Sequence, residues 1–489
     1  MPWMVQSVWL LMGGVFAGLY FGNAPIAGAL WVAPVCLLHV TRHARPLAGL
    51  LSVWSVIFVV ACVRHRDIVP LDRILYFAII AIASIVWTIP YAADRLIASR
   101  GSGFASTMIF PLAWAALEFA KMRVSPDSSW MSPAYSQCGV LPLLQLTSVT
   151  GLPGIIFVVA WFASTVNWMW DHDFAWGAVG SGGLLYSGVL AAVLIAGVVR
   201  IARAPTAGPS VRTAAISYPR DHFVRGEVTR IIQARVRDDE RRMLRGKTVR
   251  LQDWFLESSR REAGAGARII VWPELNLLVF KEDEADFLVR AQQLAREQHI
   301  YLLMGMAAVQ LGDPHPLENK AVLLNPAGAV DFSYDKSRLV PGWEETLSRR
   351  PGNRILPISD TPYGRVTAAI CADGDEPRLM RQAGEQRADL LLLPVNDWAG
   401  IKDIHRRMAV FRAVENGVSL FRAASTGVST AVDPYGRTLA TKDDVSPGGQ
   451  VMVVQLPIAR VATVYARAGD LFGWLCVAGL VAAFAISRW

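Results

Sequence analysis

Apolar and polar residues are unevenly distributed along this chain. From residue 1 to about residue 200, long apolar runs alternate with short charged segments. A helix that crosses the hydrocarbon core of a membrane needs about 20 apolar residues. The runs predict seven spans, at residues 5–22, 24–40, 47–63, 74–93, 104–121, 151–170 and 179–199. The first run lacks a basic flank and a small-residue cleavage site, so we expect it to stay in the mature protein.

The pattern changes at about residue 201. Charged amphipathic stretches, such as residues 225–262, now alternate with short β-branched or leucine-rich runs. Such an alternation predicts a layered α/β domain. The predicted strands are residues 213–217, 268–272, 301–309, 321–325, 366–371, 389–394, 418–424 and 428–433. A last uncharged span covers residues 471–486, and Arg488 and Trp489 follow it as an interfacial anchor.

These patterns divide the chain into three parts. We expect a transmembrane domain of about seven spans over residues 1–200, a soluble domain over residues 201–467, and a C-terminal transmembrane helix over residues 468–489. Basic residues flank the spans on both sides, so the positive-inside rule does not orient them.

The composition agrees with a membrane protein. Of 489 residues, 53% are hydrophobic and 18% are charged, against about 25% charged in soluble domains. The net charge of +8 comes without a dense Lys/Arg run, which favours an anionic membrane surface over nucleic acid. The five cysteines form no CxxC pair, and the chain contains no HExxH, P-loop or GxGxxG motif. We therefore expect no disulfide framework, no metal and no cofactor.

Three predicted strand ends carry candidate catalytic residues. Glu274 follows an apolar run and a proline, Lys336 precedes a loop with the acids Glu344 and Glu345, and Cys371 ends a run that enters a polar turn. A nucleophilic thiol needs a base and a group that stabilises the oxyanion. A buried strand cysteine without a role is the alternative for Cys371. A Cys–His pair would need a distant partner, namely His222, His299, His315 or His405.

The order Glu274, Lys336, Cys371, with spacings of 62 and 35 residues, resembles the Glu-Lys-Cys triad of the nitrilase superfamily. The predicted membrane spans extend the resemblance to the membrane-bound branch, the apolipoprotein N-acyltransferases. Further segments that resemble this branch are residues 110–118, 135–137, 339–341, 396–398, 412–417, 433–437 and 465–470. The chain departs from the family beside the triad: Ala372-Asp373 replaces Tyr-Glu, and Leu275-Asn276 replaces Thr/Ser-Ala.

The resemblance implies a fold and a reaction. The fold would be a multi-span α-helical membrane domain plus a nitrilase-like α-β-β-α sandwich. Cys371 would take a fatty acyl chain from a phospholipid as a thioester and pass it to the α-amino group of an S-diacylglyceryl-cysteine lipoprotein. Glu274 would act as base, and Lys336 would stabilise the thiolate and the oxyanion. The alternatives are an amidase or acyltransferase with another acceptor or donor, and a membrane scaffold with a relic triad.

The resemblance also implies secondary roles and a location. Glu344 and Asp373 would support the catalytic lysine, and Trp343, Asn396 and Trp398 would contribute to a lipid or substrate site. The expected partners are a phospholipid donor, a diacylated lipoprotein acceptor and the bilayer, with the chain acting as a monomer. The location would be the bacterial inner membrane, with the catalytic domain on the periplasmic side.

Overall fold

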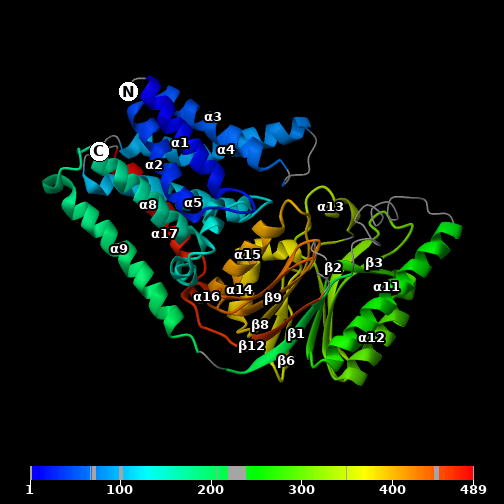
Figure 1. Cartoon of the computed structure of the whole chain (residues 1–489). Coiled ribbons are helices and arrows are strands. Elements are labelled where there is room, and N and C mark those ends of the chain that lie inside the picture. The colour runs from blue at the N-terminus through cyan, green and yellow to red at the C-terminus, as the bar shows by residue number, and fades with distance from the viewer. Residues whose placement is uncertain are drawn as a thin grey trace. The chain divides into compact units, whose positions relative to one another are not determined.

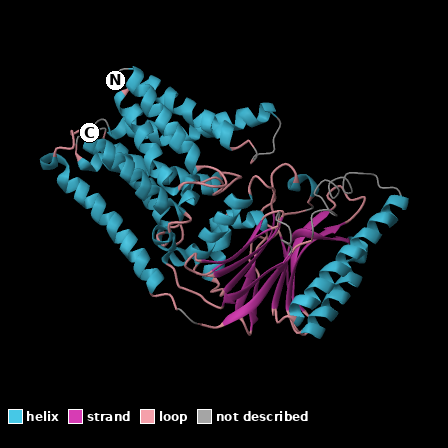
Figure 2. Cartoon of the chain, viewed as in Figure 1, coloured by secondary structure: helices cyan, strands magenta, loops and turns pink. Residues whose placement is uncertain are grey.

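A computed structural model describes residues 3–66, 68, 73–98, 103–205, 208–218, 238–348, 350–444 and 451–487. The chain forms two compact units, one made of Met1–Ala204 with Ala468–Trp489 and the other of Pro205–Arg467. All described strands belong to the second unit, whereas the first is helical (Figure 2).

Among the described residues of the first unit, eight longer helices lie at the positions of the eight predicted spans. They are α1 (Trp3–Tyr20), α2 (Ala27–His43), α3 (Pro46–Arg64), α4 (Arg73–Ile97), α5 (Ile109–Val124), α8 (Leu152–Trp170), α9 (Trp176–Ala202) and α17 (Leu471–Ile486). Among the described residues, α1, α3, α4, α8 and α9 are long and apolar enough to cross a membrane. The helices α2, α5 and α17 are shorter, at 17, 16 and 16 residues. Short helical turns between them are η2 (Phe104–Met108), η3 (Pro133–Gln137), α6 (Leu141–Leu144) and α7 (Thr147–Thr150).

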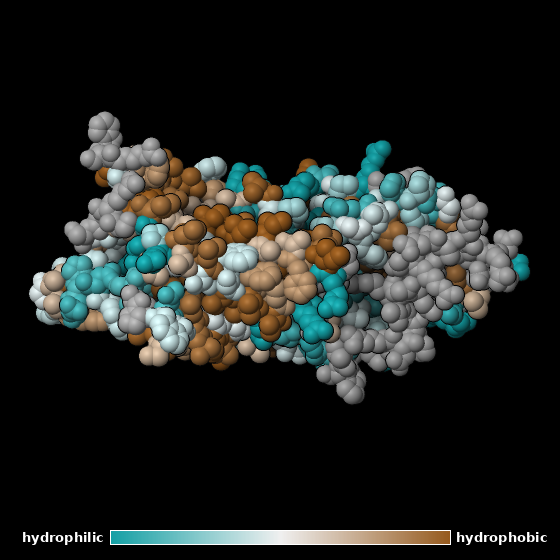
Figure 3. All heavy atoms as spheres, turned by 90° about the horizontal axis from the view of Figure 1, so that it is seen from above, coloured by the Kyte–Doolittle hydropathy of each residue, from teal (hydrophilic) through white to brown (hydrophobic). Residues whose placement is uncertain are grey.

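This helical unit is apolar outside and partly polar inside. Large apolar side chains such as Leu11, Ile82 and Ile195 are more than 60% exposed, and apolar atoms gather over this part of the surface (Figure 3). Inside, the Arg42 guanidinium donates two hydrogen bonds to the buried Asp94 carboxylate, at 2.8 and 2.9 Å. Apolar exposure on this scale is expected of a surface that faces lipid.

The second unit is a four-layer α-β-β-α sandwich. One sheet has the strand order β12-β1-β2-β3-β4-β5 and the other β11-β10-β9-β8-β7-β6. The first consists of β1 (Ser210–Ile216), β2 (Ile269–Phe280), β3 (Tyr301–Val309), β4 (Leu317–Leu324), β5 (Val330–Asp335) and β12 (Val451–Pro457). The second consists of β6 (Ile358–Thr361), β7 (Gly364–Ala368), β8 (Leu390–Asn396), β9 (Ser419–Ser425), β10 (Val428–Val432) and β11 (Thr438–Asp443).

Helices cover the outer face of each sheet (Figure 1). The pair α11 (Asp238–Gly264) and α12 (Glu284–Gln298) packs on the first sheet, and α14 (Pro377–Glu385) and α15 (Lys402–Asn416) pack on the second. The remaining short helices are η4 (Lys281–Asp283), α13 (Glu344–Leu347), η5 (Cys371–Asp375) and α16 (Val464–Ala468). The strongly buried aromatic rings of Trp272, Phe255 and Phe287 fill the layer between α11, α12 and the first sheet.

The predicted strands coincide with β1, β2, β3, β4, β7, β8, β9 and β10. Four strands were not predicted. The strands β5, β6 and β11 leave part of their length exposed and lack a continuous apolar run. The strand β12 has the short apolar run 451–454 but is only partly buried. Within the predicted helical stretch 225–262, residues 225–237 lie outside the described residues, and the described helix α11 begins at Asp238. Arg488 and Trp489 also lie outside them.

Two predicted strand ends are wrong in detail. The strand β7 ends at Ala368, and Cys371 begins the following 3-10 turn η5. The strand β2 does not end before Glu274 but continues to Phe280, with an irregular register between Trp272 and Leu277. Both differences place the candidate residue in an interruption of regular structure, where a side chain can be re-aimed.

The irregularity in β2 directs Glu274 toward the second sheet. In a regular strand Glu274 would share a face with Trp272, which packs outward against α11. Leu275 instead takes a left-handed conformation, with φ +52°. The neighbouring strand accommodates this bulge because Gly305 has no side chain: a Cβ there would lie 2.5 Å from the Pro273 carbonyl oxygen.

Candidate active site

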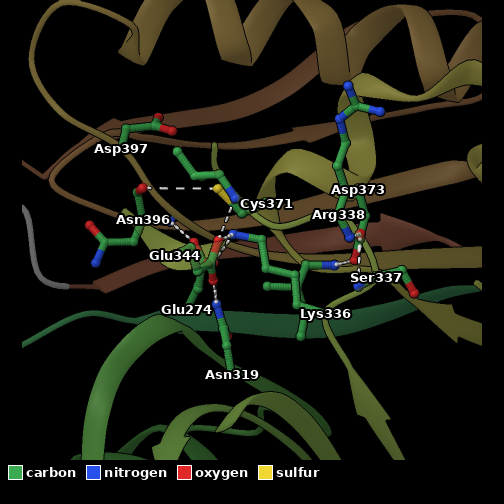
Figure 4. Close-up of polar contacts among 12 residues, drawn as sticks. Glu274, Asn319, Lys336, Ser337, Arg338, Glu344, Cys371, Asp373, Asn396 and Asp397 are labelled. Carbon is green, nitrogen blue, oxygen red and sulfur yellow. Dashed lines mark hydrogen bonds and ion pairs between the residues drawn. The ribbon is translucent and has the colours of Figure 1, made fainter. Parts of the chain in front are cut away.

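The candidate nucleophile lies in a constrained turn between the two sheets. Cys371 is buried and has φ +48°, a left-handed conformation that is uncommon for a residue other than glycine. Its Sγ lies 3.9 Å from the carbonyl oxygen of Asn396, at the end of β8. The Glu274 carboxylate lies next to the thiol and raises its pKa. The turn therefore presents the sulfur between a carbonyl and a base (Figure 4).

Four buried side chains form the centre of the site. The Lys336 ammonium donates to Glu274 Oε1 and to Glu344 Oε2, both at 2.7 Å. The Asn319 amide donates to Oε1 of the same two glutamates, at 2.8 and 2.6 Å. Each carboxylate also receives a backbone N–H, Glu274 from Asn396 at 2.9 Å and Glu344 from Val340 at 2.9 Å. The sequence-predicted residues Glu274, Lys336, Glu344 and Cys371 thus come together in one cluster (Figure 4).

The charges of this cluster fix its resting protonation. Burial opposes the charged form of Glu274, but Lys336 outweighs burial and lowers the pKa of Glu274. Burial likewise opposes the ammonium, but Glu274 and Glu344 raise the pKa of Lys336 well above its usual value. Burial and the Glu274 carboxylate together raise the pKa of Cys371, against the opposing effect of Lys336. At rest the site holds a carboxylate base, an ammonium and a neutral thiol.

Lys336 lowers the pKa of Cys371, as expected from the sequence, but burial and the Glu274 carboxylate outweigh this effect. The cluster has two carboxylates for one ammonium, so a free thiolate would add a second excess negative charge. The thiol can therefore give up its proton only as the carboxylate takes it and the negative charge moves to the attacked carbonyl. General-base catalysis by Glu274 meets this requirement.

We expected Asp373 to support the pair of Lys336 and Glu344, and its contacts are with the backbone that follows Lys336. Its Oδ1 accepts the N–H groups of Ser337 at 3.1 Å and Arg338 at 2.7 Å. Its Oδ2 accepts the N–H of Ile370 at 3.0 Å and the hydroxyl of Tyr334 at 2.9 Å. Burial raises the pKa of Asp373 to about 7. Asp373 thus connects the nucleophile turn to the segment that carries the lysine (Figure 4).

The three residues predicted to bind substrate differ in their contacts. Asn396 holds Glu274 and faces the thiol through its main chain, while its side-chain oxygen accepts the Thr426 hydroxyl at 3.0 Å. Trp343 precedes α13 and is half-buried against the core beside the first sheet. Trp398 is half-buried in the turn after β8. A role of these three residues in binding substrate stays a prediction.

Asn319 is the main site residue that sequence reasoning missed. It lies in β4, between the charged residues Glu318 and Lys320 and just before the predicted strand 321–325. Its role depends on the pairing of β4 with β3 and on the bulge in β2, which place its amide between Glu274 and Glu344. Within this polar stretch, the sequence offered no signal that distinguishes Asn319 from its neighbours.

The alternative Cys–His pair receives no support from the described histidines. His299 and His315 are exposed, whereas Cys371 is buried. His405 is buried near Cys371, but its Nδ1 lies 2.7 Å from Asp397 and its Nε2 2.9 Å from Asp375. Both ring nitrogens therefore face carboxylates, which leaves Glu274 as the base. His222 lies outside the described residues.

Comparisons with known proteins agree with this geometry. The family model described as the carbon–nitrogen hydrolase matches residues 233–466, and the model described as the apolipoprotein N-acyltransferase N-terminal domain matches residues 13–165. A protein of Geobacter metallireducens named apolipoprotein N-acyltransferase is 28% identical over 98% of this chain and 95% of its own. A protein of the same name from Bradyrhizobium diazoefficiens is 27% identical over 80% of this chain and 75% of its own.

Among solved structures, an amidase from Nesterenkonia sp. aligns with a TM-score of 0.40 and 22% identity, over 52% of this chain and 92% of its own. The two family models match in chain order, one on the helical unit and one on the sandwich that holds Glu274, Lys336 and Cys371. The protein of Geobacter metallireducens matches nearly the whole length of the chain. The chain therefore belongs to the apolipoprotein N-acyltransferase family and is an enzyme of the acyltransferase class.

Proposed function

We propose that this enzyme transfers a fatty acyl chain from a phospholipid, through a thioester on Cys371, to the α-amino group of an S-diacylglyceryl-cysteine lipoprotein. The observation that carries the proposal is the buried Cys371–Glu274–Lys336 cluster in a chain that also has helices long enough to span a membrane. Both substrates are lipids, and each buried CH₂ group contributes about 0.8 kcal/mol to membrane partitioning. A membrane-embedded enzyme meets both of them where they reside.

The first half of the reaction forms the acyl-enzyme. Cys371 Sγ attacks the ester carbonyl carbon as its proton passes to Glu274. The negative charge that develops on the carbonyl oxygen is stabilised by the Lys336 ammonium, which the two glutamates hold in place. The ester C–O bond then breaks, and the departing oxygen takes the proton from Glu274. The products are a thioester on Cys371 and a lysophospholipid.

The second half transfers the acyl chain to the acceptor. The neutral α-amino group of the lipoprotein attacks the thioester carbonyl and gives a proton to Glu274. The C–S bond breaks as the new amide forms, and the Cys371 sulfur recovers the proton. Glu274 acts as base and then acid in each half, which is why its hydrogen bonds from Lys336, Asn319 and the Asn396 backbone have to hold it in one place.

We also propose a location and an acting unit. If α1, α2, α3, α4, α5, α8 and α9 all cross the bilayer, an odd number of crossings puts β1 on the side opposite the start of α1. Because the acceptor is a lipoprotein that has been exported, we place the catalytic domain on the periplasmic side of the bacterial inner membrane. We further propose that the enzyme acts as a monomer.

The test is the intact mass of the purified protein after incubation with a diacyl phospholipid. The expected result is the added mass of one fatty acyl group, absent in Cys371→Ala and present in the control Cys138→Ala, which removes a half-buried cysteine of the helical unit. A diacylated lipopeptide is then expected to remove the adduct and to gain the same mass.

Two results would contradict the proposal. An adduct that only water or another amine removes would replace the lipoprotein acceptor by a different one. Absence of any adduct on the wild-type protein with all phospholipids tried would reject acyl transfer from phospholipid, and a membrane-anchored amidase would then become the better reading of the same triad.

A further inference from the structure

A second buried cluster of charged side chains lies beside the nucleophile. Asp397 Oδ1 accepts a hydrogen bond from His405 Nδ1 at 2.7 Å, and Asp397 Oδ2 accepts one from Arg422 at 2.5 Å. His405 Nε2 forms an ion pair with Asp375 Oδ1 at 2.9 Å. All four side chains are buried. The proposed reaction uses none of them.

The position of His405 connects the two segments that enclose the thiol. Asp375 ends the η5 turn that Cys371 begins. Asp397 directly follows Asn396, which holds Glu274 through its N–H and faces the thiol through its carbonyl. The imidazole therefore spans from the nucleophile turn to the end of β8. In Figure 4, Asp397 and Glu274 lie on opposite sides of the Cys371 side chain.

The packing around Asp397 leaves little room for it to move. A Cβ added to Gly427 would lie only 2.4 Å from Asp397 Oδ2. The backbone N–H of Asp397 also donates to the Ser425 carbonyl at 3.0 Å. The carboxylate to which His405 binds is thus fixed, and a fixed anchor allows the imidazole to fix the nucleophile turn in its place.

The cluster is also balanced in charge. Burial opposes protonation of His405, but Asp375 and Asp397 raise its pKa to about 9, so the ring is a cation at neutral pH. The groups that face the ring are Asp375 and Cys371 from η5 and Asp397 from the end of β8, with Arg422 of β9 behind Asp397. The two carboxylates and the two cations cancel. The Cys371 sulfur, an Asp397 carboxylate oxygen and a His405 ring nitrogen lie within 4.8 Å of one another. An excess of charge in this cluster therefore acts directly on the sulfur.

We infer that His405 is a positioning residue for the nucleophile: its imidazolium holds the Cys371 turn against the end of β8 and cancels the carboxylate charge next to the sulfur. This inference rests on the proposed function of Cys371 as the nucleophile. Loss of the ring would leave one excess negative charge beside a site that already carries one, and it would release the turn. Both effects oppose the transfer of negative charge from the sulfur to the substrate.

The experiment measures the pH dependence of Cys371 alkylation by iodoacetamide in the full-length protein in detergent, read by peptide mass. In His405→Gln we expect the midpoint of the profile to rise by about one pH unit or more, and formation of the acyl adduct at pH 7 to slow at least tenfold. In Asp375→Asn, which removes a negative charge and keeps the ring, we expect the midpoint to move in the opposite direction.

Glu415→Gln is the matched control. Glu415 is fully buried on the same helix as His405 and pairs with Arg412 at 3.0 Å, outside the cluster around Cys371. This variant loses a buried ion pair and is expected to keep the wild-type midpoint. An unchanged midpoint in His405→Gln, or an equal shift in Glu415→Gln, would overturn the inference.

Because alkylation needs no lipid, the two proposals fail separately. A wild-type protein that is alkylated normally but never acylated would contradict the proposed function. The midpoints of Cys371 alkylation in His405→Gln and Asp375→Asn, if they shift in opposite directions, would still support the role of His405. If His405→Gln does not fold, the downward shift in Asp375→Asn is the result that supports the inference, and its absence rejects it.

Discussion

The substitution Asp373→Asn tests whether the nucleophile turn is held in place by a buried carboxylate. The carboxylate accepts four hydrogen bonds, from the N–H groups of Ser337, Arg338 and Ile370 and from the Tyr334 hydroxyl. An asparagine keeps its oxygen toward Ser337 and Arg338 and places its NH₂ group where Oδ2 was. The tyrosine hydroxyl can turn to accept from this NH₂ group, but the N–H of Ile370 cannot, and it is left without an acceptor.

The size of the effect follows from that single unpaired donor. A buried N–H without an acceptor costs about 1–3 kcal/mol. Near the melting temperature, each kcal/mol lowers the Tm of a domain of this size by about 2–4 °C. Movement of the turn to relieve the unpaired N–H displaces the sulfur, and a loss of about 1.4 kcal/mol in transition-state stabilisation slows acylation about tenfold. The assays are thermal unfolding in detergent and the rate of acyl-adduct formation by intact mass.

Asp389→Asn provides a matched control for this prediction. Asp389 accepts the backbone N–H of Arg365 at 2.8 Å, at the start of β7 and away from the site. Its substitution is expected to leave the acylation rate of the folded protein unchanged, whatever its effect on the Tm. The reasoning would be refuted if Asp373→Asn acylated at the wild-type rate, or if the two variants slowed acylation equally.

Three further predictions concern the same domain. Glu344→Gln removes one of the two carboxylates that hold the Lys336 ammonium, so we expect acyl-adduct formation to slow at least tenfold, and a rate within twofold of wild type would contradict this role. Asn319→Ala removes a hydrogen bond from both Glu274 and Glu344, each worth about 1.5–3 kcal/mol as a bond to a charged group, so the Tm should fall, and an unchanged Tm would argue against the shared amide. His405 has its pKa raised to about 9 in the folded protein, so its contribution to stability is complete below pH 6.5 and is lost as the pH rises through 9. We expect the free energy of unfolding to fall by on the order of 3 kcal/mol over this range, and the same slope in His405→Gln would show that another group titrates.

The candidate catalytic residues could be singled out in the sequence because each one adjoins a recognisable pattern. Glu274 and Cys371 each follow an apolar run, and Lys336 precedes a loop rich in acids. Their order along the chain, together with the spans, was enough to indicate the family. The eight predicted spans each coincide with a helix, because apolar length is a strong signal.

The parts that sequence reasoning missed depend on contacts between distant segments. The left-handed Leu275, which redirects Glu274, has no sequence signature, because glycine is the usual residue in that conformation. The bridging role of Asn319 requires the register of β4 on β3. The role of Asp373 requires that the backbone after Lys336 lie beside the nucleophile turn, 36 residues away along the chain. Such pairings become visible only in the folded molecule.

The contacts of Asn396 have a consequence for changing the substrate range of this enzyme. Its N–H fixes the base and its carbonyl faces the sulfur, and both groups belong to the main chain, whereas the side chain bonds only to Thr426 among the contacts described above. Every amino acid except proline supplies the same two main-chain groups. Residue 396 is therefore a position where a library of side chains can be tried while the main-chain contacts to Glu274 and to the Cys371 sulfur are kept.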